Sequence, residues 1–282
     1  LDHAGPMAWT AEDCGIMLQA MAGHDPADPA SANRQIPDYR AASQRDAMWI
    51  ASAMTDGEVE QTEQSGGRPF EVEAPEGGTY HVRFVASDPE AYDRFYNIFA
   101  NPMLWFIQHY LWDQSNAPDI RRHEVDAFDD GYKTDNEDLA AAVLDEVADQ
   151  DNPVVMVHDY HLYTLPEVVR REKPDVFLHH FIHIPWTQPD AWRVLPKSMR
   201  NQIYAGVLAN DIVGFHTRSY RWNFLQCCRD LMDLDVDFEH GVVHIDDREV
   251  WVRAYPLPID YAATRKVAES ERTKQFEAEI ER

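Results

Sequence analysis

The stretch Val154-Val155-Met156-Val157-His158-Asp159-Tyr160-His161 decides how this chain folds. Its first four residues are a short, continuous apolar run, the kind that is buried on both faces in a parallel β-sheet. The four residues that follow are polar or titratable. Open α/β sheets bind their ligands at the carboxyl ends of the strands. The stretch therefore predicts a buried strand that ends in a binding site.

Strands and helices alternate along the following sequence at lengths typical of a parallel α/β fold. A helix is expected from residue 165, a second strand over residues 176–184 and a third over residues 211–215. The later helices carry apolar residues at helical spacing, such as Ile203 in one and Phe224 in the next. The pattern predicts an α/β fold with a Rossmann-like, doubly wound parallel sheet.

The flanking regions give three further predictions. Residues 68–84 are rich in β-forming residues and are interrupted by turn residues at 75–78, which predicts a hairpin. Thr134 and Glu137 have the spacing of a capping box and predict the start of a helix. Residues 262–282 are a charged, weakly amphipathic helix candidate, which we expect to be a linker or a frayed end.

The composition is strongly acidic. The chain carries 50 Asp and Glu against 25 Lys and Arg, for a net charge of −25. An acidic excess spread over a whole chain is typical of a surface that stays hydrated in concentrated salt, so we expect a halophilic, salt-loving source. The alternative is an acidic protein that simply avoids nucleic acid. In both cases phosphate backbones would be repelled, and no nucleic-acid partner is expected.

The cysteines and the hydropathy exclude several other classes. The cysteines are Cys14 and the adjacent Cys227 and Cys228, which have neither zinc-site spacing nor the pattern of a disulfide framework. No apolar run is long enough to span a bilayer, and we find no signal-peptide pattern. We therefore expect a soluble, cytoplasmic protein without a membrane partner.

The first forty residues differ from the rest. Residues 10–23 are predicted to form a helix, and a proline-rich loop follows. The segment LDHAGPMAWTAEDCGIMLQAMAGHDPADPAS resembles a piece of the amidase signature family, whose catalytic serines and lysine lie outside the matching piece. We expect residues 1–40 to be an amidase-like remnant, an extra helical segment without amidase chemistry. An ordinary N-terminal helix is the alternative.

The candidate site combines two adjacent strands. Asp159 follows the strand that ends at Val157, and His183 lies at the far end of the next strand, so both are expected at one rim of the sheet. Five histidines lie in these two segments, and imidazole is a common metal ligand. On a strand, however, His179 and His180 face opposite sides. We therefore predict no metal site and expect these two rings to be held by hydrogen bonds.

Four blocks of the sequence resemble the trehalose-6-phosphate synthase family, whose members are retaining glycosyltransferases. In family order, the blocks are FYNIFANPMLWFIQHYLWD, VVMVHDYHLYTLPEVVRREKPDVFLHHFIHIPW, LPKSMRNQIYAGVLANDIVGFHTRSYRWNFLQCC and VRAYPLPID. The resemblance covers nearly everything from about residue 83 to residue 260. It implies one half of a GT-B glycosyltransferase, in which residues 41–282 form the N-terminal, acceptor-binding domain.

The resemblance also implies an activity and roles for four residues. As in an α,α-trehalose-phosphate synthase of trehalose biosynthesis, glucose would pass from a nucleotide sugar to glucose 6-phosphate with retention. Asp159 would accept hydrogen bonds from the acceptor hydroxyls, and His183 would reach toward the transferring glucosyl group. Tyr96 and Trp105 would shape the sugar-phosphate pocket, with core packing as their alternative role. Carboxylates suit hydroxyl donors, and aromatic rings suit the apolar face of a sugar.

The partners implied by the resemblance are a sugar phosphate and a nucleotide sugar. No cofactor is expected, because the nucleotide-glucose donor is itself a substrate. The chain stops at Arg282, about where the family's C-terminal donor domain begins, and the family's N-terminal glycine-rich loop has no counterpart here. We therefore expect a fragment that shows no synthase activity alone. A homo-oligomer is left open.

Two alternatives follow from the same comparison. The sequence HIPWTQPDAWRVLP departs from the family pattern after HIP and is similar to a side branch of glucosylglycerol-phosphate and pseudo-glycosyl synthases. This departure concerns the acceptor more than the class of reaction. A non-catalytic sugar-phosphate-binding module is the second alternative, because it would need the acceptor pocket but no donor half.

Overall fold

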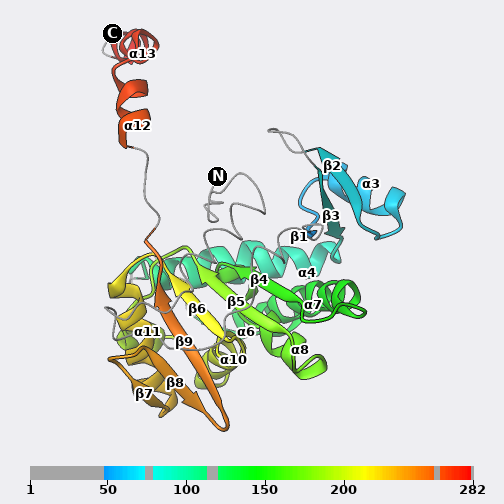
Figure 1. Ribbon diagram of the computed structural model, residues 1–282, viewed down its shortest axis with the longest axis vertical. Coiled ribbons are helices and arrows are strands. Elements are labelled where there is room, and N and C mark those ends of the chain that lie inside the picture. Colours follow the sequence, from blue (N-terminus) through cyan, green and yellow to red (C-terminus); the bar gives the residue numbers. More distant parts are fainter. Residues whose placement is uncertain (1–47, 74–78, 113–119, 257–260, 281–282) are drawn as a thin grey trace.

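A computed structural model describes residues 48–73, 79–112, 120–256 and 261–280 (Figure 1). Its main feature is a six-stranded sheet with the strand order β4-β5-β6-β9-β8-β7, and a three-stranded sheet, β1-β3-β2, lies to one side. The helix predicted over residues 10–23 and the amidase-like segment lie outside the described residues.

The main sheet is parallel in its first four positions and antiparallel at its far edge. Parallel pairs join β4 to β5, β5 to β6 and β6 to β9, whereas β8 pairs antiparallel with both β9 and β7. The predicted parallel α/β sheet is confirmed. The strands are β4 (Val154–His158), β5 (Phe177–Ile182), β6 (Ile212–Phe215), β7 (Asp235–Asp237), β8 (Val242–Ile245) and β9 (Arg248–Ala254).

One expectation about β4 is wrong. The apolar run of this strand suggested burial on both faces, but only Val157 is fully buried and the other residues of β4 are half-buried. Among the described strands β4 is the first of the main sheet, so only one of its edges pairs with a neighbour. An apolar run indicates that a strand is buried, but it does not show whether the strand is central in the sheet or at its edge.

Helices pack on one face of the sheet. Ile182 of β5, Phe215 of β6 and Val252 of β9 belong to one hydrophobic core with Ile203 and Phe224 of the helices that follow. All of these side chains are buried, which confirms the predicted helical faces. The helices of this layer are α8 (Leu165–Glu172), α9 (Pro189–Trp192), α10 (Lys197–Val207) and α11 (Arg218–Met232).

The helix predicted to start at Thr134 begins earlier. The chain is already helical in α6 (Arg122–Ala127) and η2 (Phe128–Tyr132), and α7 (Lys133–Val147) continues without a side-chain cap. A capping box needs an extended N-cap residue, and the residue before α7 is helical instead. The apolar face of α7, which includes Leu139, Val143 and Val147, packs against α8 and β4 in a second core.

A second long helical segment runs through α4 (Pro89–Asp93), η1 (Arg94–Trp105) and α5 (Phe106–Gln108). Its start is capped by the Asp88 carboxylate, which accepts from the N–H groups of the next turn. The middle part is a π-helix that contains Pro102, a residue without an N–H to donate. The buried face of η1 packs against η2 and the short 3-10 helix η3 (Tyr160–Leu162), which places this segment beside the end of β4.

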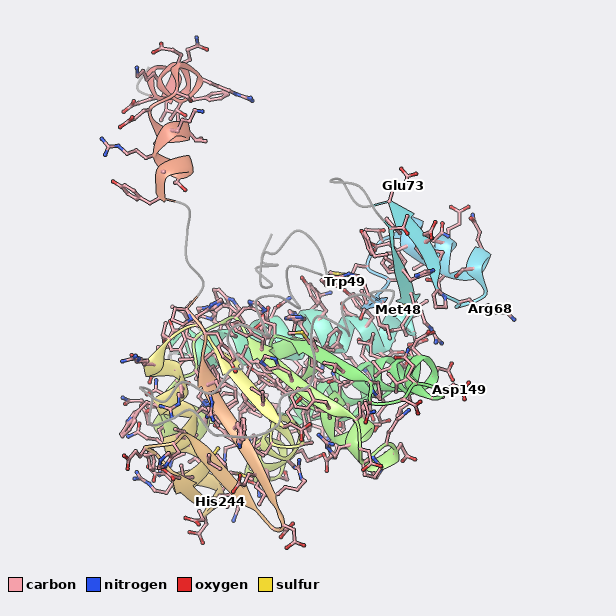
Figure 2. The ribbon with its side chains drawn as sticks, viewed as in Figure 1. Met48, Trp49, Arg68, Glu73, Asp149 and His244 are labelled. Carbon is pink, nitrogen blue, oxygen red and sulfur yellow. The ribbon has the colours of Figure 1, made fainter. Side chains whose placement is uncertain are left out.

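The three-stranded sheet contains the predicted hairpin. Its strands are β1 (Met48–Ser52), β2 (Phe70–Glu73) and β3 (Thr79–Val85), and β2 pairs antiparallel with β3. Together with α3 (Asp56–Ser65), this small sheet forms a unit beside the main sheet. Figure 2 labels Met48, Trp49, Arg68 and Glu73 in this unit, all of them away from the main sheet. The buried Asp135 of α7 accepts hydrogen bonds from Ser52 and Ser87 and ties the unit to the rest of the fold.

The predicted C-terminal helix is two helices, α12 (Tyr261–Ala268) and α13 (Glu271–Ile280). Ser270 separates them, and its hydroxyl accepts from the Thr273 N–H as an N-cap does. Both helices project away from the main sheet (Figure 1). In the part of the chain that the structure describes, no helix is long and apolar enough to cross a membrane.

Candidate functional site

Two residues of the predicted site come together where β4 and β5 end. Asp159 directly follows β4 and His183 directly follows β5, and the strands pair with His158 beside Phe181. The backbone N–H of His183 donates to Oδ1 of Asp159 over 3.3 Å, and the backbone N–H of Asp159 donates to the Phe181 carbonyl over 2.9 Å. The prediction that Asp159 and His183 share one rim of the sheet is confirmed. We call this edge the carboxyl rim.

The backbone of Asp159 is strained. Its φ of 63° and ψ of −177° lie in a region that residues other than glycine rarely adopt. Two hydrogen bonds hold it there: its N–H donates to Phe181, and Nε2 of His180 donates to its carbonyl over 2.9 Å. Such a conformation costs about 1–3 kcal/mol and is found mostly at functional sites. The strain therefore agrees with the choice of Asp159 as a candidate site residue.

The His183 ring is oriented by a second imidazole. Nδ1 of His158 lies 3.1 Å from Nε2 of His183, within hydrogen-bond distance. Burial lowers the pKa of His158 to about 4, and burial, followed by the effect of His158, lowers the pKa of His183 to about 3. Both rings are neutral at pH 7, so one nitrogen donates and the other accepts. His183 can thus offer a neutral hydrogen-bonding group rather than a positive charge.

The other two histidines of β5 behave differently from each other. His180 donates to the Asp159 carbonyl, as expected of a ring held by hydrogen bonds. For His179 that expectation is wrong, because both its ring nitrogens are buried and no described residue bonds to them. Its ring instead packs against Phe181 and Tyr255. Among the described residues, no three His, Cys, Asp or Glu side chains gather in a way that could hold a metal ion.

The turn after β4 is held from behind by two buried side chains that sequence reasoning missed. The Tyr132 hydroxyl donates to the Tyr160 carbonyl over 2.6 Å and accepts from the Tyr163 N–H over 3.0 Å. Asn136 bonds to one carbonyl and two N–H groups of residues 161–165. Both residues lie one helical turn apart on the face that packs against the turn. The sequence signal that could have revealed them is a tyrosine and an asparagine at this spacing in an otherwise apolar helix face.

The family model of glycosyltransferase family 20 matches residues 29–282, which is most of the chain. The chain belongs to glycosyltransferase family 20. The match contains both strands of the carboxyl rim, the helix η1 and the turn that carries Asp159. The amidase resemblance of residues 1–40 gains no support from the comparisons with known proteins.

Known relatives of this family 20 chain include two kinds of transferase. A validamine 7-phosphate valienyltransferase of Streptomyces hygroscopicus subsp. jinggangensis is 31% identical over 212 residues, which are 74% of this chain and 42% of the relative. An α,α-trehalose-phosphate synthase (UDP-forming) of Aspergillus niger is 36% identical over 181 residues, 62% of this chain and 35% of the relative. The chain therefore spans less than half the length of these curated relatives.

The fold of the family 20 chain matches solved structures. An α,α-trehalose-phosphate synthase (UDP-forming) from Burkholderia vietnamiensis superposes with a TM-score of 0.60 at 22% identity, covering 83% of this chain and 54% of the other. At this level of identity the likeness concerns the fold alone. It confirms the predicted fold, one half of a GT-B glycosyltransferase.

In this family 20 chain, Tyr96 is in direct contact with the rim. Its ring lies nearly parallel to that of His161, 12° apart with centroids at 5.6 Å, and His161 belongs to the same turn as Asp159. Trp105 is the last residue of η1, and its ring stacks on His109 at 4.0 Å. Direct contacts thus join Tyr96 to the rim, whereas the contacts described for Trp105 lie within its own helix and the core. Their roles toward a sugar stay predictions.

Two further hydrogen bonds fasten the helical segment to the rim. The Tyr160 hydroxyl donates to Oδ1 of Asn101 over 2.6 Å, and the Tyr163 hydroxyl donates to the buried Gln108 over 2.8 Å. One bond therefore joins the turn to η1 and the other joins it to α5. The wall that carries Tyr96 is fixed relative to Asp159 by these bonds.

The first residue of the sequence departure after HIP, Trp186, lies in the core. Trp186 is fully buried, its ring stacks on Trp192 at 4.6 Å, and it contacts Tyr163 edge-on. The Asn223 side chain donates to its carbonyl over 2.7 Å. Trp186 thus packs in the core, where its ring contacts Tyr163 of the segment that follows β4.

Proposed function

We propose that this chain is the acceptor-binding half of a retaining glycosyltransferase that moves glucose from a nucleotide sugar to glucose 6-phosphate. The proposal rests on one observation: in a family 20 chain, the Asp159 carboxylate is held in a strained backbone conformation at the carboxyl rim. A carboxylate accepts hydrogen bonds from sugar hydroxyls, and bonds to a charged group are the stronger kind. The names of the relatives support a phosphorylated acceptor and a donor that releases UDP.

The remaining groups of the rim fit supporting roles. His183 is neutral and adds no charge at the rim; its Nε2 lies within hydrogen-bond distance of His158, and its Nδ1 is buried without a partner among the described residues. Tyr96 supplies an aromatic ring beside the turn, which suits the apolar face of a hexose. No cofactor enters the proposal, because in this reaction the nucleotide leaves with the electrons of the broken glycosidic bond and nothing is oxidised or reduced. We also propose that the donor is held mainly outside this chain.

Acceptor binding by the chain itself tests the proposal. Isothermal titration with glucose 6-phosphate should give saturable binding, and Asp159→Asn should weaken it about tenfold or more, because a charged acceptor of hydrogen bonds becomes a neutral one. Asp149→Asn is the matched control, since Asp149 is exposed in the segment that follows α7 and does not contact the rim. Undetectable binding to the folded chain, or equal affinity for the Asp159 and Asp149 variants, contradicts the proposal.

A second acceptor class has specific support. The valienyltransferase of Streptomyces hygroscopicus is named for validamine 7-phosphate, a different phosphorylated acceptor. A competition titration with glucose 6-phosphate, validamine 7-phosphate and glycerol 3-phosphate would rank the candidates. Tightest binding of glucose 6-phosphate supports the trehalose-phosphate reaction, and tightest binding of another acceptor assigns the side-branch reaction. Binding without transfer in the complete protein would instead support a sugar-phosphate-binding module.

We propose in addition that the protein works in the cytoplasm of a halophilic, salt-loving cell. The support is the net charge of −25, which destabilises a compact chain by self-repulsion unless salt screens it. Raising the KCl concentration from about 0.1 M to 1 M shortens the screening length from about 10 Å to about 3 Å. The melting temperature should rise over this range. A melting temperature that falls or stays constant with KCl contradicts the proposal.

A further inference from the structure

A cavity of about 410 Å³ lies on the edge of the sheet opposite to the carboxyl rim. Arg248, which lines it, is the first residue of β9, and Arg170 bonds to Asp211, which directly precedes β6. This is the edge where the parallel strands begin, whereas Asp159 and His183 follow strands that end. We call it the amino edge. The cavity is therefore separate from the site proposed above, and nothing in that function uses it.

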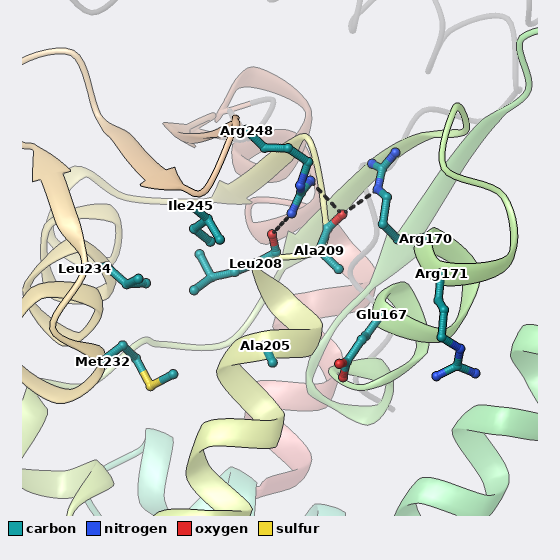
Figure 3. A pocket seen from close by; sticks show the side chains of 10 residues that line it. All are labelled: Glu167, Arg170, Arg171, Ala205, Leu208, Ala209, Met232, Leu234, Ile245 and Arg248. Carbon is teal, nitrogen blue, oxygen red and sulfur yellow. Dashed lines mark hydrogen bonds between the residues drawn. The ribbon is translucent and has the colours of Figure 1, made fainter.

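One arginine of the cavity is fully engaged in structure. The Arg170 guanidinium donates to the carbonyls of Pro174, Val176 and Ala209 and forms an ion pair with Asp211 at 2.6 Å. Figure 3 shows its bond to Ala209 at the end of α10. Because its nitrogens are already engaged, Arg170 has little capacity left to bind a ligand.

The neighbouring Arg248 is different. It donates to the carbonyl of Leu208 over 2.8 Å and to that of Ala209 over 3.4 Å, and these partners are uncharged (Figure 3). No described carboxylate lies within ion-pair distance of it, and its Nε has no partner among the described residues. Burial, followed by the positive charge of Arg170, lowers the pKa of Arg248. The negative charges of Asp211 and Asp246 partly offset this lowering of the pKa, but neither carboxylate forms a direct ion pair with Arg248, which is therefore a half-buried cation whose direct partners among the described residues are carbonyls.

The rest of the lining suits an apolar body. Leu208, Leu234 and Ile245 line the cavity next to Arg248, while Glu167 and Arg171 lie on the α8 side (Figure 3). Cavities of about 300–1,000 Å³ with an apolar lining and a few placed polar groups are typical of small-molecule sites. Guanidinium groups bind carboxylates and phosphates with two parallel hydrogen bonds.

We propose that the amino-edge cavity binds a small amphiphilic anion, whose carboxylate or phosphate pairs with Arg248 while its apolar body covers Leu208, Leu234 and Ile245. The competing explanation is purely structural, because Arg248 also caps the carbonyls at the end of α10. The two explanations differ in one respect. A capping residue affects stability alone, whereas a ligand-binding residue also determines the affinity for an added anion.

Phenyl phosphate is a suitable probe, since it joins one phosphate to one apolar ring. Titration calorimetry on the chain should show saturable binding, with phenol and inorganic phosphate each binding at least about tenfold more weakly because each lacks one half of the contacts. Arg248→Gln should weaken phenyl phosphate about tenfold or more through the lost charged hydrogen bonds. Arg265→Gln is the matched control, because Arg265 lies on α12 in an exposed ion pair with Glu269.

A second variant tests ligand binding without removing the hydrogen bonds that Arg248 donates to the carbonyls at the end of α10. Ala205→Phe fills the cavity from α10 and leaves Arg248 and its carbonyl partners in place, so it should abolish binding while the melting temperature stays near that of the parent chain. Glucose 6-phosphate should not displace phenyl phosphate. The proposal is overturned if phenyl phosphate fails to saturate, if it binds the Arg248→Gln and Arg265→Gln variants equally, if Ala205→Phe leaves its affinity unchanged, or if glucose 6-phosphate competes with it.

Discussion

The two edges of the main sheet treat polar groups in opposite ways. At the amino edge, Arg170 makes hydrogen bonds to three carbonyls and an ion pair with Asp211, and this joins α8, α10 and the starts of two strands. At the carboxyl rim, Asp159 has a strained backbone, and Nδ1 of His183 is buried without a partner among the described residues. Arg170 thus stabilises the amino edge, whereas the carboxyl rim contains a strained backbone and a ring nitrogen without a partner among the described residues, both of which cost stability.

The largest effect that we expect is a loss of unfolding free energy in acid, which should come first from the carboxyl rim. Burial lowers the pKa of His158 to about 4 and of His179, His180 and His183 to about 3, below the ordinary value of 6.5. Below pH 6.5 these histidines bind protons in the unfolded chain, whereas in the folded chain the buried rings stay neutral down to a lower pH. The stability that these neutral rings contribute is therefore complete above pH 6.5 and falls as the pH drops toward 3–4, by about 1.4 kcal/mol per pH unit for each histidine.

Urea unfolding at pH 7 and pH 5 measures this loss. His179→Phe keeps a ring of similar size in place of one that has no hydrogen bonds, so the variant should lose about 2 kcal/mol less than the parent between the two pH values. An equal loss in parent and variant would mean that His179 is not held neutral in the folded chain.

Removing Arg170 should damage the amino edge and leave the rim intact. The side chains of Arg170 and Asp211 are only 16% and 30% exposed, so Arg170→Ala strands a half-buried carboxylate and should cost about 3 kcal/mol of unfolding free energy. Arg171→Ala is the control: its side chain is 65% exposed and pairs at the surface, so its loss should stay within about 0.5 kcal/mol. Chemical denaturation checks both values, and glucose 6-phosphate should bind both variants as it binds the parent.

Asp159 offers a sharper test, because strain and function can be separated at one position. Asp159→Ala and Asp159→Gly both remove the carboxylate and should both lose acceptor binding. Glycine accepts the positive φ without strain, although it also makes the unfolded chain more flexible, so the glycine variant should be more stable than the alanine variant by about 1 kcal/mol. If the alanine variant is the more stable of the two, Asp159 is not strained.

The smallest effect concerns the imidazole pair. His158→Phe keeps a ring beside His183 but removes the hydrogen bond at 3.1 Å, so the proton of His183 should distribute between its two nitrogens. Nitrogen NMR of His183 would detect this change, and acceptor binding should weaken roughly threefold, as expected for the loss of one orienting hydrogen bond. His216→Phe is the control, because His216 contacts His183 ring to ring. An unchanged His183 spectrum in His158→Phe would rule out the orienting role.

The carboxyl rim was predictable from the sequence because its determinants are local. An apolar run followed by His158 and Asp159, and a second run that ends at His183, place both polar segments at the ends of neighbouring strands, and the pairing of β4 with β5 is parallel as expected. The roles of Tyr96 and Trp105 came only from family resemblance, and contacts with the rim are observed for Tyr96 alone.

The amino edge could not be predicted in the same way. Arg170, Asp211 and Arg248 lie far apart in the sequence, and each resembles an ordinary surface charge until the strands bring them together. The continuous helix through η2 was missed for a related reason. A capping motif at Thr134 is a local preference, and the packing of η2 against η1 overrides it.

The hydrogen bonds around Asp159 also imply an order of assembly. The turn is held by Tyr132 and Asn136, which a ribosome produces before the turn itself, whereas the backbone of Asp159 is held by His180 and Phe181, which emerge later. During synthesis the turn can therefore dock while Asp159 is still free to relax. We expect the carboxylate to take its final direction only when β5 joins the nascent sheet, so a ribosome stalled before that strand would display a formed turn without a formed site.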